Sequence, residues 1–78
     1  MKNITVDAAL WRSRVLPEGI LERWLVRDGA CVSTGTPVTL VRIEDALHEI
    51  MAPGNGVLKM SAKINAVIEP GSVLAELN

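Results

Sequence analysis

The chain has 78 residues, a net charge of −1 and 22% charged residues, which suits one small soluble domain over residues 1–78 rather than a charged tail or a multidomain enzyme. Its lysines and arginines are scattered and are not interleaved with aromatic residues, so we expect no nucleic-acid partner. The longest apolar run, Ala8–Trp11, falls far short of the ~20 residues of a membrane span. We therefore expect no membrane partner, no targeting segment and a cytoplasmic location.

Short runs of aliphatic and β-branched residues predict strands along the whole chain. In chain order, the predicted strands are 4–6, 20–26, 30–32, 39–43, 47–51, 56–62, 66–68 and 73–77. The segments between them hold Gly, Pro, Asp and Asn, which supply the backbone angles that tight turns require. No window keeps the apolar spacing of an ordinary helix. The pattern therefore predicts an all-β sandwich or barrel.

A glycine-strand-turn-strand plan occurs twice in the chain. Gly19 to Leu21 lies 37 residues before Gly56 to Leu58, and Val32 to Gly35 lies 36 residues before Ile68 to Gly71. This repeat predicts two interlocked sheets related by a pseudo-twofold axis. Adding 36 residues to the turn at Glu44 leads past the last residue of the chain, so we expect a hairpin at one end of the body and the termini at the other.

The order and spacing of several short stretches resemble one family. Trp24 to Val26 leads into Asp28-Gly29-Ala30-Cys31-Val32, Glu49 to Pro53 continues to Gly56, and Gly71 precedes a closing Val73-Leu74-Ala75. Together these stretches resemble the biotinyl/lipoyl domain family over nearly the whole chain. The resemblance implies a flattened β-barrel of two four-stranded antiparallel sheets, with a cofactor-bearing lysine at the tip of an exposed hairpin.

The attachment position that this resemblance implies is occupied by Asp45, as counted from both Gly35 and Pro53. Glu44 matches the acidic residue before the lysine in lipoyl members, and Ala46 matches the alanine that often follows it. A carboxylate is not a nucleophilic amine and cannot form the amide link to lipoate or biotin. We therefore expect no cofactor at this hairpin.

The remaining lysines are poor substitutes for an attachment residue. Lys2 lies at the terminus, while Lys59 and Lys63 fall on or near a predicted strand. Three interpretations stay open. The chain is an interaction module without its arm, with protein partners among 2-oxo acid dehydrogenase or carboxylase components. Alternatively, it is a genuine lipoate or biotin carrier whose attachment residue is altered or lies elsewhere, or it is an adaptor-type binding domain that shares only the fold. None of these is an enzyme.

A partner surface is predicted beside the hairpin. In lipoyl domains the loop after the first strand lies next to the hairpin, and here that loop contains Trp11, Arg12 and Arg14. With Glu44 and Asp45 at the tip, aromatic and basic groups would flank an acidic turn, and aromatic and arginine residues are favoured interface anchors. The alternative is that Asp45 is a solvated turn residue and that Trp11 covers the core.

Three further residues are predicted to be structural. His48 is the only histidine and shares a strand face with Ile50, not with Glu49, so it has no orienting acid, nucleophile or second histidine for a catalytic or metal site. Cys31 is the only cysteine, so an internal disulfide is excluded. We expect Cys31 to be a small buried residue. Trp24 is expected to pack in the core.

Overall fold

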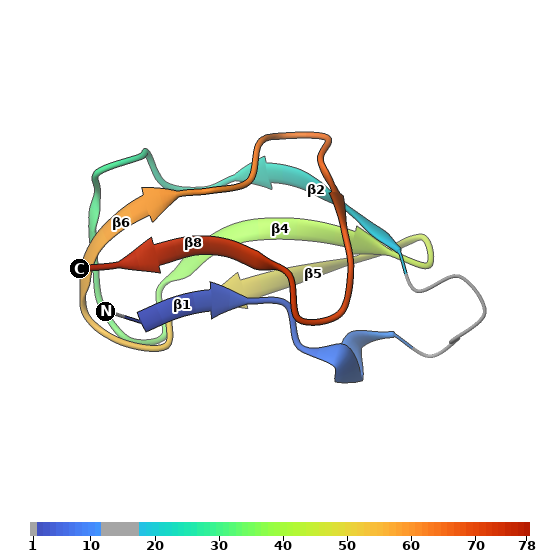
Figure 1. The fold of residues 1–78 in the computed structure, drawn as a ribbon, viewed down its shortest axis with the longest axis horizontal. Coiled ribbons are helices and arrows are strands. Elements are labelled where there is room, and N and C mark those ends of the chain that lie inside the picture. Colours follow the sequence, from blue (N-terminus) through green and yellow to red (C-terminus); the bar gives the residue numbers. More distant parts are fainter. Residues whose placement is uncertain (1, 12–17) are drawn as a thin grey trace.

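The computed structural model of the chain describes residues 2–11 and 18–78 and has two four-stranded antiparallel sheets (Figure 1). The strands are β1 (Lys2–Thr5), β2 (Gly19–Trp24), β3 (Cys31–Val32), β4 (Pro37–Ile43), β5 (Ala46–Met51), β6 (Gly56–Met60), β7 (Val67–Ile68) and β8 (Val73–Leu77). One sheet has the order β1-β8-β6-β3, and the other has the order β5-β4-β2-β7. The predicted all-β class and each predicted strand are confirmed, with ends that differ by a few residues.

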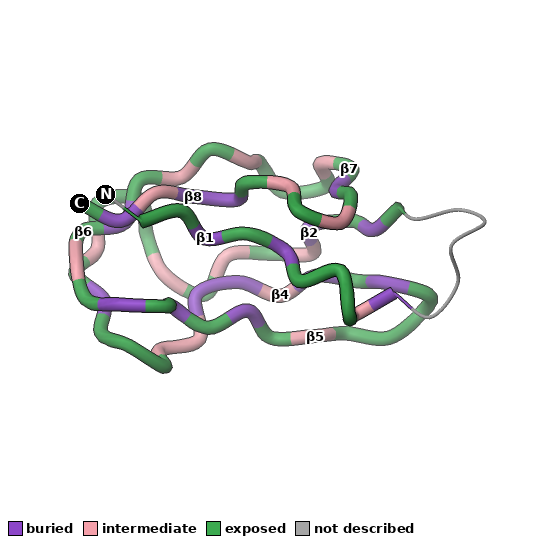
Figure 2. The backbone as a smooth tube through the Cα atoms, turned by 60° about the horizontal axis from the view of Figure 1, so that its bottom comes forward, coloured by how far each residue is buried: buried purple, intermediate pink, exposed green. Residues whose placement is uncertain are grey.

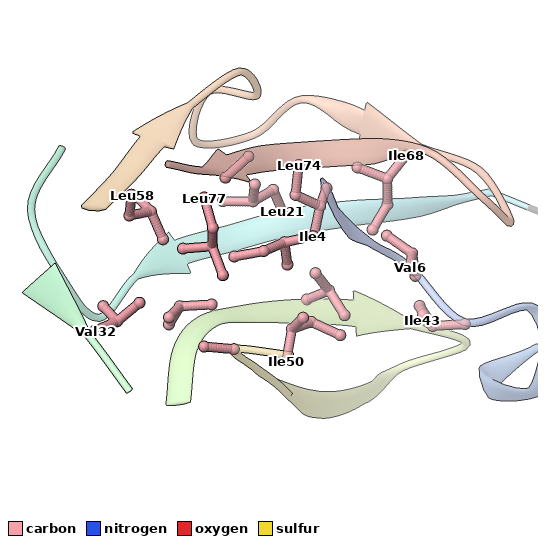
Figure 3. Packing of buried hydrophobic residues seen from close by; sticks show 14 of the residues in the cluster. Ile4, Val6, Leu21, Val32, Ile43, Ile50, Leu58, Ile68, Leu74 and Leu77 are labelled. Carbon is pink, nitrogen blue, oxygen red and sulfur yellow. The ribbon is translucent and has the colours of Figure 1, made fainter. Parts of the chain in front are cut away.

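The two sheets pack face to face and form a flattened sandwich that is not a closed barrel (Figures 1 and 2). Along β4, Val41 and Ile43 point inward and are buried, while Arg42 between them is exposed. The core consists of such inward aliphatic side chains from both sheets, with Leu21 and Leu58 fully buried (Figure 3). Burying this apolar surface is the main favourable term for a small domain without a disulfide.

The predicted pseudo-twofold relation is visible in matched backbone hydrogen bonds. The Gly35 amide donates to the Ala52 carbonyl at 2.9 Å, and the Gly71 amide donates to the Val6 carbonyl at 2.9 Å. Both glycines have a left-handed φ, 86° for Gly35 and 85° for Gly71, which glycine adopts without a steric penalty. Corresponding turns in the two halves therefore share one conformation, as the sequence repeat predicts.

One extra residue in β2 breaks this relation. The pairing of β2 with β4 shifts register between Leu21 and Arg23, which marks a β-bulge, whereas β6 pairs with β8 without a shift. The extra residue explains why the two halves lie 37 residues apart before this point and 36 after it. The buried hydroxyl of Thr39 donates to the Arg23 carbonyl at 2.7 Å and so satisfies a carbonyl next to the bulge.

The hairpin between β4 and β5 lies at one end of the long axis, and the two termini lie at the other end (Figure 1). This arrangement confirms the expectation from the asymmetric repeat. A three-residue 3₁₀ turn, η1 (Ala8–Leu10), follows β1 and was not predicted. The described residues contain no helix that is long and apolar enough to cross a membrane.

The prediction of a buried cysteine is wrong, because Cys31 is exposed. Successive strand residues point to opposite faces, and in the short strand β3 the inward position is taken by Val32. Trp24 packs against the core as predicted, and its indole N–H donates to the Ala62 carbonyl at 3.1 Å. His48 is half-buried on the inward side of β5, together with the buried Ile50, which is the predicted face.

Candidate functional site

The hairpin tip consists of Glu44 and Asp45, which join β4 and β5 beyond the last strand pair, Ile43 and Ala46. Both turn residues are exposed and have left-handed backbone angles, with φ of 52° for Glu44 and 64° for Asp45. Two consecutive positive φ values are characteristic of the type I′ turn that is favoured in two-residue hairpins. Asp is among the few residues other than Gly that adopt this region readily, so Asp45 suits the turn.

The base of the hairpin is held by a close approach of β2. A Cβ atom added to Gly19 would lie 2.9 Å from Cγ1 of Ile43 and 3.0 Å from the carbonyl oxygen of Arg42. Only a residue without a side chain lets the start of β2 lie against the end of β4 at this distance. Gly19 therefore positions the strand end that leads into the tip. The sequence marked Gly19 as part of the repeat but gave no sign of this contact.

An ion pair lies on the outer face of the same sheet. The Arg42 guanidinium donates through Nε and Nη2 to the two carboxylate oxygens of Glu22, each at 3.1 Å. These hydrogen bonds raise the pKa of Arg42, and the charge of Asp45 adds to the effect. The same contact holds the pKa of the Glu22 carboxyl below its ordinary value. Arg42 is exposed and Glu22 is only half-buried, so solvent screens the pair, which fixes the direction of Arg42 and adds little stability.

A surface pocket of about 340 Å³ lies under the hairpin. Its described lining residues come from η1, the hairpin and β5, and are Leu10, Ile43, Glu44, Ala46 and His48. None of these side chains carries a hydroxyl, thiol or amine nucleophile. No three His, Cys, Asp or Glu side chains lie together as a metal-binding group anywhere in residues 2–11 and 18–78.

The predicted partner surface is only partly visible. Glu44, Asp45 and Ala46 lie exposed at the tip, whereas Trp11 is only 8% exposed and belongs to the core cluster. Its indole N–H donates to the Glu18 carbonyl at 3.1 Å. This placement matches the alternative in which Trp11 covers the core. Arg12 and Arg14 lie outside the described residues, so their position beside the acidic tip stays a prediction.

No lysine lies at the hairpin among the described residues. Lys2 is in β1 and its amine approaches Gly54, at the opposite end of the body. Lys59 is in β6 beside Glu76 of β8, and Lys63 is in the turn after that strand. Each is exposed, but none projects on a hairpin tip. The geometry therefore offers no second position equivalent to Asp45.

Comparison with known proteins gives a distant match to a carboxylase. No protein-family model matches the chain. The chain is 31% identical over 64 residues, 82% of its length, to an acetyl-CoA carboxylase from Dictyostelium discoideum. It spans only 3% of that protein's length. Taken with the two four-stranded sheets, this distant similarity is consistent with a biotinyl/lipoyl-type domain.

Proposed function

We propose that this chain is a non-enzymatic biotinyl/lipoyl-like module that carries no cofactor and acts through protein contacts. The observation that carries the proposal is the exposed hairpin tip, which presents the Asp45 carboxylate where the resemblance implies an attachment lysine. Carrier domains use the long stem of an acylated lysine to move a tethered group between active sites. Asp45 has a short stem and a group that only accepts hydrogen bonds.

The partner is proposed to be a component of a carboxylase-type or 2-oxo acid dehydrogenase-type enzyme in the cytoplasm. The similarity to an acetyl-CoA carboxylase supports the carboxylase type over the dehydrogenase type. Recognition of the hairpin by such a partner would use the shape of the body together with the acidic tip of Glu44 and Asp45. The same similarity supports a second candidate, a biotin carrier that is modified at another residue.

Intact mass spectrometry separates the two candidates. The wild-type chain and the variants Asp45→Lys and Asp45→Arg are each incubated with biotin ligase and biotin, and separately with lipoate ligase and lipoate. We expect no mass increase for the wild type and one cofactor-sized increase for Asp45→Lys. Asp45→Arg is the matched control, because it supplies the positive charge without an acylatable amine. A modified wild-type chain would support the carrier candidate and contradict our proposal.

The contact function is tested by competition. The unmodified wild-type chain is added to a ligase reaction that contains an authentic biotinyl domain. Because the chain is proposed to keep the body and hairpin shape that ligases and carrier-dependent enzymes recognise, we expect it to slow modification of the authentic domain competitively. If Asp45→Lys folds but is never modified and the wild type does not compete, the hairpin lacks carrier geometry and the proposal is wrong.

A further inference from the structure

Strand β5 is an open sheet edge. Within residues 2–11 and 18–78 it is the terminal strand of the sheet β5-β4-β2-β7 and pairs with β4 alone. In the described part of the chain, no hydrogen bond outside the strand ladders involves a residue of Ala46–Met51. The side chains of Leu47 and Met51 are 54% and 45% exposed. An edge of this kind presents backbone N–H and C=O groups that can pair with another strand.

The other three edges carry features that discourage such pairing. The edge strands β3 and β7 have only two residues each. Strand β1, the pseudo-twofold counterpart of β5, has four residues, begins with Lys2 and has a register shift between Ile4 and Thr5. Short length, lysine and bulges are the ordinary protections of sheet edges. Strand β5 has six residues and contains no Lys, Arg or Pro.

The hairpin geometry indicates which backbone groups of β5 are free. In a two-residue turn the flanking residues, here Ile43 and Ala46, form a hydrogen-bonded pair, and such pairs alternate along an antiparallel ladder. The backbone groups of Ala46, His48 and Ile50 therefore face β4. The backbone N–H and C=O groups of the alternate residues Leu47, Glu49 and Met51 face the open edge.

We propose that β5 pairs with β5 of a second copy of this chain, antiparallel and with the two His48 residues opposite each other on the twofold axis. This register places Glu49 of each copy opposite Leu47 of the other and Ala46 opposite Ile50, so no like charges face each other. Moving the register by two residues would place Glu49 opposite Glu49 in one direction and opposite Asp45 in the other, and like charges directly opposite each other are destabilising. Moving it by one residue would turn the core face of one copy toward solvent. The pairing therefore has one favoured register.

Two observations favour a second copy as the occupant. The net charge of −1 gives little repulsion between copies, and chains near zero net charge associate more readily. In the favoured register the residues from Ala46 to Ile50 pair with the same residues of a second copy without opposing like charges, so a second copy supplies a complementary edge. The joined sheets would form one continuous eight-stranded sheet. This inference does not depend on the proposed function, because it uses β5 and not the tip residue.

The test is sedimentation of the full chain over a range of concentrations, with Glu49→Pro as the key variant. The Glu49 amide faces the open edge, so proline at this position removes an edge donor without removing a bond to β4. Each dimer would lose two edge hydrogen bonds, and we expect the association constant to fall about tenfold or more. Glu49→Gln is the control, because it removes the charge and keeps the amide. If both variants associate equally, edge pairing is ruled out.

A second pair of variants keeps the test decisive if Glu49→Pro fails to fold. Leu47→Glu places a carboxylate opposite Glu49 of the other copy, whereas Val67→Glu places one at the other edge of the same sheet, where the side chain is 63% exposed. We expect Leu47→Glu to abolish the dimer and Val67→Glu to leave it unchanged. Amide exchange at Leu47 and Glu49 should slow as the wild-type concentration rises. A monomeric wild type, or equal loss in the two glutamate variants, would overturn the inference.

Discussion

Replacing Thr39 by Val tests why the two halves of the fold differ by one residue. Thr39 is fully buried, and its hydroxyl donates to the Arg23 carbonyl beside the β-bulge in β2. The corresponding position in the second half is Ala75, where the ladder is regular and no bulge carbonyl needs a donor. Thr39 therefore supplies the hydrogen-bond donor that the bulge needs. Replacing it by Val, which has the same shape but no hydroxyl, measures how much this hydrogen bond contributes to stability.

The size of the effect follows from two opposing terms. Leaving the part-buried Arg23 carbonyl without this partner costs at most about 1–3 kcal/mol, and the extra methyl group of Val returns up to about 0.8 kcal/mol. We expect Thr39→Val to lower the free energy of unfolding by about 1 kcal/mol. In a domain of this size that corresponds to a fall in the melting temperature of about 4–8 °C.

Urea unfolding, followed by circular dichroism, measures the change in the free energy of unfolding. Repeating the substitution in a chain that lacks Glu22 tests whether the bulge causes that change. In a chain that lacks Glu22 the bulge is removed, so the Arg23 carbonyl can enter the ladder and Thr39→Val should cost nothing. If that deletion does not fold, Ala75→Ser is the control and should destabilise, because its hydroxyl has no bulge carbonyl to meet. A Thr39→Val chain as stable as the wild type would refute this account of the bulge.

Three further predictions concern turns and charge. Asp45→Ala should destabilise the chain by about 1 kcal/mol in urea unfolding, because φ 64° imposes on Ala the left-handed penalty that Asp largely avoids; an unchanged stability would show that Asp45 has no advantage in this turn. Gly35→Ala and Gly71→Ala should each cost about 1–2 kcal/mol, since both have left-handed φ and open space around a Cβ, and unequal costs would contradict the pseudo-twofold match. The lowered pKa of Glu22 means that its pairing with Arg42 stabilises the fold above the unfolded pKa and is lost as the pH falls through the folded pKa. Wild type should therefore lose slightly more stability on acidification than Glu22→Gln, as measured by unfolding at neutral and acid pH.

Most of the fold was predictable because short local stretches of sequence determine the turns. Gly35 and Gly71 mark equivalent left-handed turns, and a one-residue error at such turns would reverse every strand face. The alternation along 47–51 predicted that His48 shares a face with Ile50 and not with Glu49, and in β5 that shared face points inward. The location of the hairpin followed from counting between fixed turns, and the structure places Glu44 and Asp45 at its tip.

What escaped prediction depends on contacts between distant segments. In the sequence, the β2 bulge appears only as a change in the repeat spacing from 37 to 36 residues. The hydroxyl that bonds the Arg23 carbonyl beside the bulge belongs to Thr39, which lies 16 residues later in another strand. The contact that requires Gly19 also joins segments remote in sequence. η1 is three residues long, too short for a helical period to register. Cys31 is exposed although cysteine is usually buried, because Val32 beside it takes the inward position of the short strand β3.

The turn conformation bears directly on the meaning of Asp45. Gly, Asn and Asp adopt a backbone φ of 64° most readily. A lysine at this position incurs part of the ~1–2 kcal/mol penalty of the left-handed region. Cofactor attachment requires an amine at the tip, and an unstrained turn favours a short polar side chain. Asp45 meets only the second requirement. A hairpin whose tip residue suits its own backbone keeps its shape without an amine, and this property supports the proposed module that acts through protein contacts.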